Sequence, residues 1–126
     1  MSVLDGPHDR VTVQQAAART GHSGAEADSG DAVLLDVREP QEWQAGHAPR
    51  AVHLSLSALT AGAGLPAEAQ ARLLIVICRS GNRSRRAAEL LSAQGVEAVD
   101  VIGGMQDWIR AGLPVVDALG EDGTVA

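Results

Sequence analysis

The sequence predicts an α/β protein with a parallel sheet sandwiched between helices. Short aliphatic runs alternate with segments of helical propensity along the chain, which is the pattern of a parallel sheet with right-handed crossovers. The run LLIVI at Leu73–Ile77 is uninterrupted by polar residues, as is typical of a strand buried on both faces. It ends abruptly in a glycine-containing, arginine-rich loop. With 126 residues and no internal repeat, the chain fits one domain.

The first part of the chain is expected to hold one strand and one helix. Residues 1–10 lack periodicity and are predicted to be a flexible lead-in. Val11–Val13 is a strand candidate, and the alanine-rich stretch Gln14–Arg19 favours a helix. Thr20–Asp31 is small, polar and rich in glycine, which indicates a connecting loop.

Two strands and two helical segments are expected next. Val33–Leu35 is a buried strand candidate. Pro40 opens a short helix that Gly46 ends, as expected from the preference of proline for helix starts and of glycine for helix ends. Ala51–Leu54 is another strand, and Ser55–Leu59 favours a helical turn.

The LLIVI strand follows a weak helix predicted around Pro66–Arg72. After this strand, Ser84 is suited to cap a helix that begins at Arg85 and ends near Gly95. Val99–Ile102 is the last strand candidate.

The end of the chain predicts a turn, a helix and a tail. Gly103 and Gly104 indicate a tight turn. Met105–Ala111 favours a helix, which the glycine and proline that follow would stop. The domain is therefore expected to span residues 11–116, with a flexible tail at 117–126.

Composition excludes several classes of protein. The single cysteine cannot form an internal disulfide, and we expect neither a metal nor a cofactor. No leader or apolar stretch of membrane-spanning length is readable, so cytoplasmic residence is expected. The formal charge of −6 and the shortage of aromatic residues argue against binding to nucleic acid or to an anionic membrane.

The chemistry is expected at Cys78, which follows the LLIVI strand. Ligands of parallel sheets bind beyond the carboxyl ends of the strands. The loop after Cys78 joins a strand tip to a helix start, where inward amides and the helix dipole favour an anion. A thiol there is expected to ionise easily and to act as a nucleophile. We predict Cys78 as the catalytic residue and the following residues as the substrate-binding loop: Arg79, Ser80, Gly81, Asn82, Arg83 and Ser84.

Four sequence blocks, in order and spacing, resemble the single-domain rhodaneses, a family of sulfurtransferases. The blocks are LLDVREPQEWQAGHAPRAVHL (34–54), IVICRSGNRSRRAAELLSAQG (75–95), VDVIGGMQDWIRAGLPV (99–115) and, more weakly, VTVQQAAA (11–18). The resemblance implies a five-stranded parallel sheet of strand order 1-5-4-2-3. The chain departs from the family where Arg50 replaces a usual glycine and Ala48 a usual aliphatic residue.

The resemblance implies that Cys78 takes up a sulfane sulfur as a persulfide within the amides of the 79–83 loop. The donor would be a small sulfur anion such as thiosulfate, or a persulfide, and the acceptor a thiol, cyanide or a protein thiol. Arg79 and Arg83 are the candidates for holding an anionic donor, because guanidinium groups present forked donors to oxyanions.

Two other functions stay open. The domain could be a persulfide relay or sensor that docks on a partner protein with little turnover of small molecules. It could also be a phosphatase or arsenate reductase, since these enzymes too surround an oxyanion with a strand-end cysteine loop. The loop argues against the latter, because tyrosine-phosphatase-like loops place their arginine one position later, where this chain has Ser84.

Several other polar and aromatic residues allow two interpretations. Asp36 and Arg38 could line the cavity or form an ion pair that braces the loops. Arg85 and Arg86 are expected on the solvated surface. Packing or capping roles are favoured for two histidines, and core positions for both tryptophans: His47, His53, Trp43 and Trp108.

Overall fold

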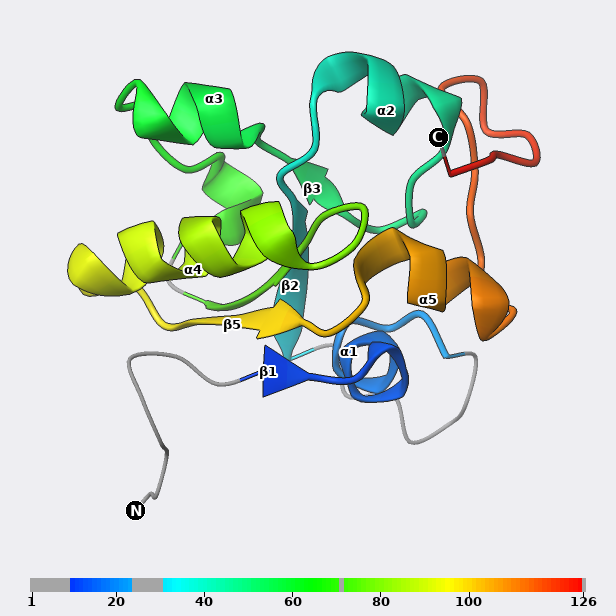
Figure 1. Cartoon of the computed structure of the whole chain (residues 1–126), viewed down its shortest axis with the longest axis horizontal. Coiled ribbons are helices and arrows are strands. Elements are labelled where there is room, and N and C mark those ends of the chain that lie inside the picture. The colour runs from blue at the N-terminus through cyan, green and yellow to red at the C-terminus, as the bar shows by residue number, and fades with distance from the viewer. Residues whose placement is uncertain (1–9, 24–30, 71, 126) are drawn as a thin grey trace.

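The sheet has the predicted class and strand order. The computed structural model describes residues 10–23, 31–70 and 72–125. In these segments five parallel strands pair in the order β1-β5-β4-β2-β3 (Figure 1). The strands are β1 (Arg10–Val11), β2 (Ala32–Asp36), β3 (Val52–His53), β4 (Leu73–Ile77) and β5 (Ala98–Val101). The helices are α1 (Val13–Arg19), α2 (Pro40–Ala45), α3 (Leu56–Thr60), the 3-10 helix η1 (Ala67–Ala69), α4 (Asn82–Ala93) and α5 (Gly104–Arg110).

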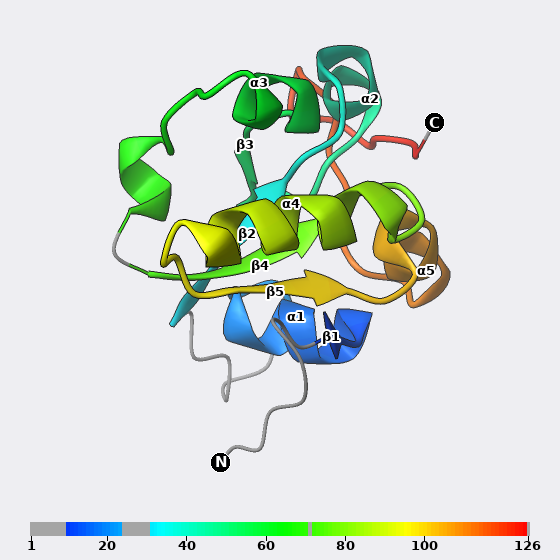
Figure 2. The same ribbon diagram turned by 60° about the vertical axis from the view of Figure 1, so that its left-hand side comes forward.

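Helices cover both faces of the sheet (Figures 1 and 2). Because successive side chains of a strand point to opposite faces, β4 contributes to two hydrophobic clusters. Leu74 and Val76 belong to the cluster beneath α3 and α4, whereas Ile75 and Ile77 belong to the one beneath α1 and α5. Trp108 of α5 is fully buried in the second cluster, which confirms its predicted core position. The apolar run is therefore the centre of the molecule.

Helix α1 begins earlier than the sequence predicts. Thr12 accepts a hydrogen bond from the Gln15 amide, and the Gln15 side chain accepts one from the Thr12 amide. This capping box ends the strand at Val11, so that Val13 is helical and not part of a strand. Arg10, predicted as part of the lead-in, instead belongs to β1. The remainder of the predicted lead-in, residues 1–9, and most of the predicted loop at Thr20–Asp31 lie outside the described residues.

The segment after Val116 returns to the domain beside α2. Val116 and His47 exchange two backbone hydrogen bonds, each 2.8 Å long. The Thr124 amide donates to the Ala45 carbonyl at 2.9 Å. The sequence predicts a flexible tail here because the segment has no hydrophobic periodicity. Its described part is instead attached by backbone hydrogen bonds, which depend little on side-chain pattern.

The described helices give no sign of a membrane-spanning segment: none is both long enough and apolar enough to cross a bilayer.

Candidate active site

Cys78 lies directly beyond the carboxyl end of β4, the central strand of the sheet. Its Sγ accepts hydrogen bonds from the amides of Gly81, at 3.1 Å, and Ser84, at 3.3 Å. The chain can turn back on the sulfur because Gly81 adopts a φ of 110°, a left-handed conformation that side chains disfavour. Two of the loop amides are therefore directed at the thiol.

The predicted cap of α4 is wrong. The helix begins at Asn82 and not at Arg85, its N-cap is Gly81, and Ser84 lies inside the first turn. First-turn amides have no partner within the helix, and Gly81 has no side chain that could accept from them. The sulfur of Cys78 fills this role for the Ser84 amide. It consequently lies at the positive end of the helix dipole, where negative charge is stabilised.

The sulfur is enclosed. The Cys78 side chain is 1% exposed and joins the hydrophobic cluster beneath α3 and α4. On the loop, Arg79, Ser80 and Asn82 are exposed. An incoming molecule therefore meets the loop before it meets the sulfur.

Arg83, a candidate for binding the donor, is held by an acidic residue. Its two terminal nitrogens donate to the two carboxylate oxygens of Glu42 on α2, at 2.6 and 2.8 Å. Hydrogen bonding by Arg83 lowers the pKa of Glu42 to about 2, against the opposing effect of partial burial. The same hydrogen bonding raises the pKa of Arg83. In this arrangement Arg83 joins the first turn of α4 to α2.

This ion pair predicts a dependence of stability on acid. Because the pKa of Glu42 in the folded protein, about 2, lies below its ordinary value of 4.5, the pair stabilises the fold above pH 4.5. That contribution is lost as the pH falls towards 2. We expect the difference in melting temperature between the native protein and Glu42→Gln to be full at pH 6 and to shrink between pH 4.5 and 2. Glu89→Gln, an exposed change on α4, is the control, and a difference that stays constant over this range would contradict the assignment.

The carbonyls of the loop are held from α5 and β1. The Met105 amide donates to the Cys78 carbonyl at 2.7 Å, and the Gln106 amide to the Arg79 carbonyl at 3.0 Å. Arg10 of β1 donates to the Gly81 carbonyl at 3.4 Å. Two of these donors are first-turn amides of α5, so two amides at the start of this helix are satisfied by carbonyls of the Cys78 loop.

A buried acid adjoins the loop and was missed from the sequence. The thiol of Cys78 donates to the Ser84 hydroxyl at 3.4 Å, and this hydroxyl donates to Oδ2 of Asp100 on β5, also at 3.4 Å. Asp100 is fully buried and forms an ion pair with Arg10. The available signal was an aspartate inside the aliphatic run of the last predicted strand, since a carboxylate is rarely buried without a partner.

Asp36 and Arg38 form an ion pair, as one of the two interpretations predicts. Both side chains are fully buried, and Arg38 Nη2 lies 2.7 Å from Asp36 Oδ2 and 2.6 Å from the Gly46 carbonyl. The pair therefore joins the end of β2 to the end of α2. Arg85 and Arg86 are exposed, as expected.

Trp43 is not the predicted core anchor. It is half-buried on α2 and stacks with two imidazoles, with ring centroids 3.6 Å from His47 and 4.9 Å from His53. Each histidine also bonds a backbone carbonyl, that of Trp43 for His47 and that of Arg38 for His53. The packing role favoured for these histidines is the one observed.

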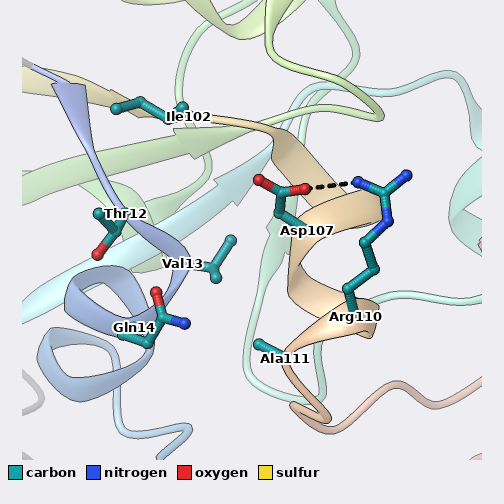
Figure 3. A pocket seen from close by; sticks show the side chains of 7 residues that line it. All are labelled: Thr12, Val13, Gln14, Ile102, Asp107, Arg110 and Ala111. Carbon is teal, nitrogen blue, oxygen red and sulfur yellow. Dashed lines mark hydrogen bonds and ion pairs between the residues drawn. The ribbon is translucent and has the colours of Figure 1, made fainter.

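Two cavities lie near these elements. One of about 500 Å³ reaches the first turn of α4 at Arg83 and extends along α3 past Leu56 and Thr60. Another of about 330 Å³ lies between the start of α1 and α5, where Asp107 and Arg110 form an ion pair (Figure 3). Cys78 lines neither cavity. Over the described residues, no group of three or more histidine, cysteine or acidic side chains is arranged to hold a metal ion.

Fold and site together define a class of α/β domain in which a cysteine at the tip of the central strand caps the following helix. The chain belongs to the rhodanese-like domain family, whose profile matches residues 24–111. A rhodanese-related protein from Thermoplasma volcanium is 30% identical with a TM-score of 0.70, and the match covers 86% of this chain and 98% of that one.

Larger proteins contain similar domains. The reduced CoADR-RHD of Bacillus anthracis is 26% identical with a TM-score of 0.65, over 82% of this chain and 17% of that one. An NAD-dependent persulfide reductase from A. fulgidus is 24% identical with a TM-score of 0.58, over 82% of this chain and 16% of that one. The latter likeness concerns the fold.

Proposed function

We propose that this protein is a sulfurtransferase that carries sulfane sulfur on Cys78. The donor is thiosulfate or a persulfide, and the acceptor is a thiol, cyanide or a protein thiol. Membership of the rhodanese-like family supports this class of reaction. The observation that carries the proposal is the position of the Cys78 sulfur, which accepts hydrogen bonds from the Gly81 and Ser84 amides at the start of α4.

The first step loads the sulfur. The Cys78 thiolate attacks the outer sulfur of thiosulfate, a sulfur–sulfur bond forms, and the bond to the sulfonate sulfur breaks. Sulfite leaves with the electron pair of that bond, and Cys78 becomes a persulfide. Amides fixed at the helix start stabilise negative charge at the sulfur without reorganising during the reaction.

The second step unloads it. A thiolate or cyanide attacks the outer sulfur of the persulfide, and the Cys78 thiolate is the leaving group. The two amides that receive the thiolate are those that held it before the first step, so the site returns to its starting arrangement. The reaction is a covalent double displacement and needs no metal or organic cofactor.

The site is less suited to phosphate esters. Tyrosine-phosphatase-like loops place their arginine one position later than Arg83, where this chain has Ser84. We therefore place phosphate hydrolysis second to sulfur transfer. Release of phosphate from an aryl phosphate faster than sulfur transfer from thiosulfate would show that the protein is a phosphatase instead.

Intact-protein mass spectrometry tests the proposal. After mixing with thiosulfate, the native protein is expected to gain the mass of one sulfur atom, and cyanide is expected to remove that mass and yield thiocyanate. Cys78→Ser should gain nothing, because the chain has no other cysteine. Alkylation of Cys78 shows that the thiol is accessible and reduced. If the native protein alkylates at Cys78 but gains no sulfur from thiosulfate, the proposal is wrong.

The same experiment separates enzyme from relay. Repeated turnover of thiosulfate and cyanide supports an enzyme. If sulfur loads but leaves only for a purified protein acceptor, the domain is a persulfide relay and the enzyme assignment is wrong.

A further inference from the structure

The hydroxyl of Ser84 stands between two groups that compete for it. It lies 3.4 Å from the sulfur of Cys78 on one side and 3.4 Å from Oδ2 of Asp100 on the other. A hydroxyl carries one proton to donate and two lone pairs to accept. It can therefore donate to the carboxylate or to the sulfur, but not to both.

Asp100 is placed beside the sulfur by the sheet and forms an ion pair with Arg10. In the β4–β5 register it stands opposite Val76, two residues before Cys78. In the β1–β5 register it stands opposite Arg10, which donates from Nε to both carboxylate oxygens at 3.2 Å and from Nη2 to one at 3.0 Å. A fully buried carboxylate needs such a partner.

We propose that Asp100 is a positioning residue that controls the Ser84 hydroxyl and so sets the pH range in which Cys78 reacts. The inference rests on the proposed function only in taking Cys78 as the nucleophile. While the Ser84 hydroxyl donates its hydrogen bond to Asp100, the Ser84 oxygen accepts a hydrogen bond from the thiol of Cys78, which favours the protonated sulfur. When the thiol proton leaves to solvent, the hydroxyl turns to donate to the thiolate, and Asp100 retains Arg10.

Charged side chains on the neighbouring elements form ion pairs of their own, and Arg79 of the loop is exposed. The ion pairs are Arg83 of α4 with Glu42 of α2, Asp36 with Arg38 after β2, and Asp107 with Arg110 on α5. Of these, the guanidinium of Arg83 interacts electrostatically with Cys78. Substitution of Asp100 leaves all of them in place and removes a single buried negative charge.

The test is the pH profile of Cys78 alkylation in Asp100→Asn, Ser84→Ala and the double variant. Asp100→Asn is expected to lower the midpoint of this profile by about one pH unit, the size usual for one charged neighbour. In the Ser84→Ala background the same substitution should shift the midpoint by less than half as much, because the hydroxyl that transmits its effect is gone. A charge that acts through space alone would give equal shifts and overturn the inference.

The matched control is Asp31→Asn. Asp31 pairs with Arg19 at 2.7 Å, but both side chains are exposed, and they lie at the end of α1 and the start of β2, away from the loop. No shift is expected in this variant. An equal shift there, or none in Asp100→Asn, would contradict the role of Asp100.

A second measurement needs no change at Asp100. Cys78 is the single thiol of the chain, so its S–H stretching band can be read directly in the infrared. The band is expected at lower frequency in the native protein than in Ser84→Ala, because the native thiol donates to the hydroxyl. Equal frequencies would overturn the inference. Neither measurement requires sulfur transfer, so failure of the proposed function would show separately, as a missing sulfur adduct.

Discussion

Gly104→Ala is expected to destabilise the fold by roughly 3 to 5 kcal/mol and to lose most of the reactivity of Cys78, since overpacking and a strained φ each cost a few kcal/mol. A methyl group at this position would meet the carbonyl oxygen of Cys78 and lie 2.7 Å from the carbonyl carbon of Arg79. These atoms are backbone and cannot rotate away. The glycine also has a φ of +58°, which disfavours a side chain.

The loss of reactivity follows from the same contact. To make room, the Cys78–Arg79 peptide must move away from the first turn of α5, and its hydrogen bond to Met105 would be lost. The sulfur would then leave the amides that it caps. Urea unfolding measures the stability, and the alkylation rate of Cys78 below the unfolding transition measures the reactivity.

Gly112→Ala is the matched control. Gly112 also has a positive φ, +75°, but no atom lies within 4 Å of the position of its added methyl group. The expected loss is about 1 kcal/mol, from backbone conformation alone. Equal losses in the two variants would show that the close approach of α5 to the loop is unimportant.

Arg38→Met is expected to cost roughly 3 to 5 kcal/mol, because removal of one partner leaves the other as an uncompensated buried charge. Arg38 and Asp36 are both fully buried, and the guanidinium also holds the Gly46 carbonyl at the end of α2. Thermal or urea unfolding at neutral pH measures the loss. The added substitution Asp36→Asn should recover part of it, since it removes the orphaned charge.

Arg110→Met provides the comparison for Arg38. Arg110 pairs with Asp107 at a similar distance, 2.8 Å, but its side chain is 72% exposed. Exposed pairs contribute about 0 to 1 kcal/mol. A cost for Arg38→Met as small as that for Arg110→Met would mean that the buried pair is dispensable.

The positions of the strands were largely predictable because short apolar stretches mark them locally, whereas the strand order was implied by the family resemblance. The polar-free character of β4 agrees with its central place in the sheet. The predicted element boundaries were wrong where a capping interaction or a glycine conformation overrode the local sequence pattern. The capping box at Thr12 shortened the first predicted strand, and the φ of Gly81 started α4 three residues early.

The sequence predicts the position of Cys78 and its loop in the fold, and it does not predict the side chains that hold this loop. Cys78 and its loop follow from a strand tip, a glycine and a helix start in one stretch of sequence. The partners of the loop come from far away: Glu42 is 41 residues from Arg83, and Arg10 is 90 residues from Asp100. No local pattern selects one carboxylate among 16 acidic residues, so these pairings depend on the tertiary fold.

The Cys78 loop and the first turn of α4 are held at several points by separate parts of the fold: by α2 through Arg83, by α5 through two carbonyls, and by β1 through the Gly81 carbonyl. The conformational entropy of the loop is therefore lost when the chain folds, and not when a substrate binds. Binding of the proposed donor then does not have to supply the free energy that orders the loop. A substitution that removes any of these contacts is therefore expected to displace the Cys78 sulfur, even when the substituted residue lies outside the loop.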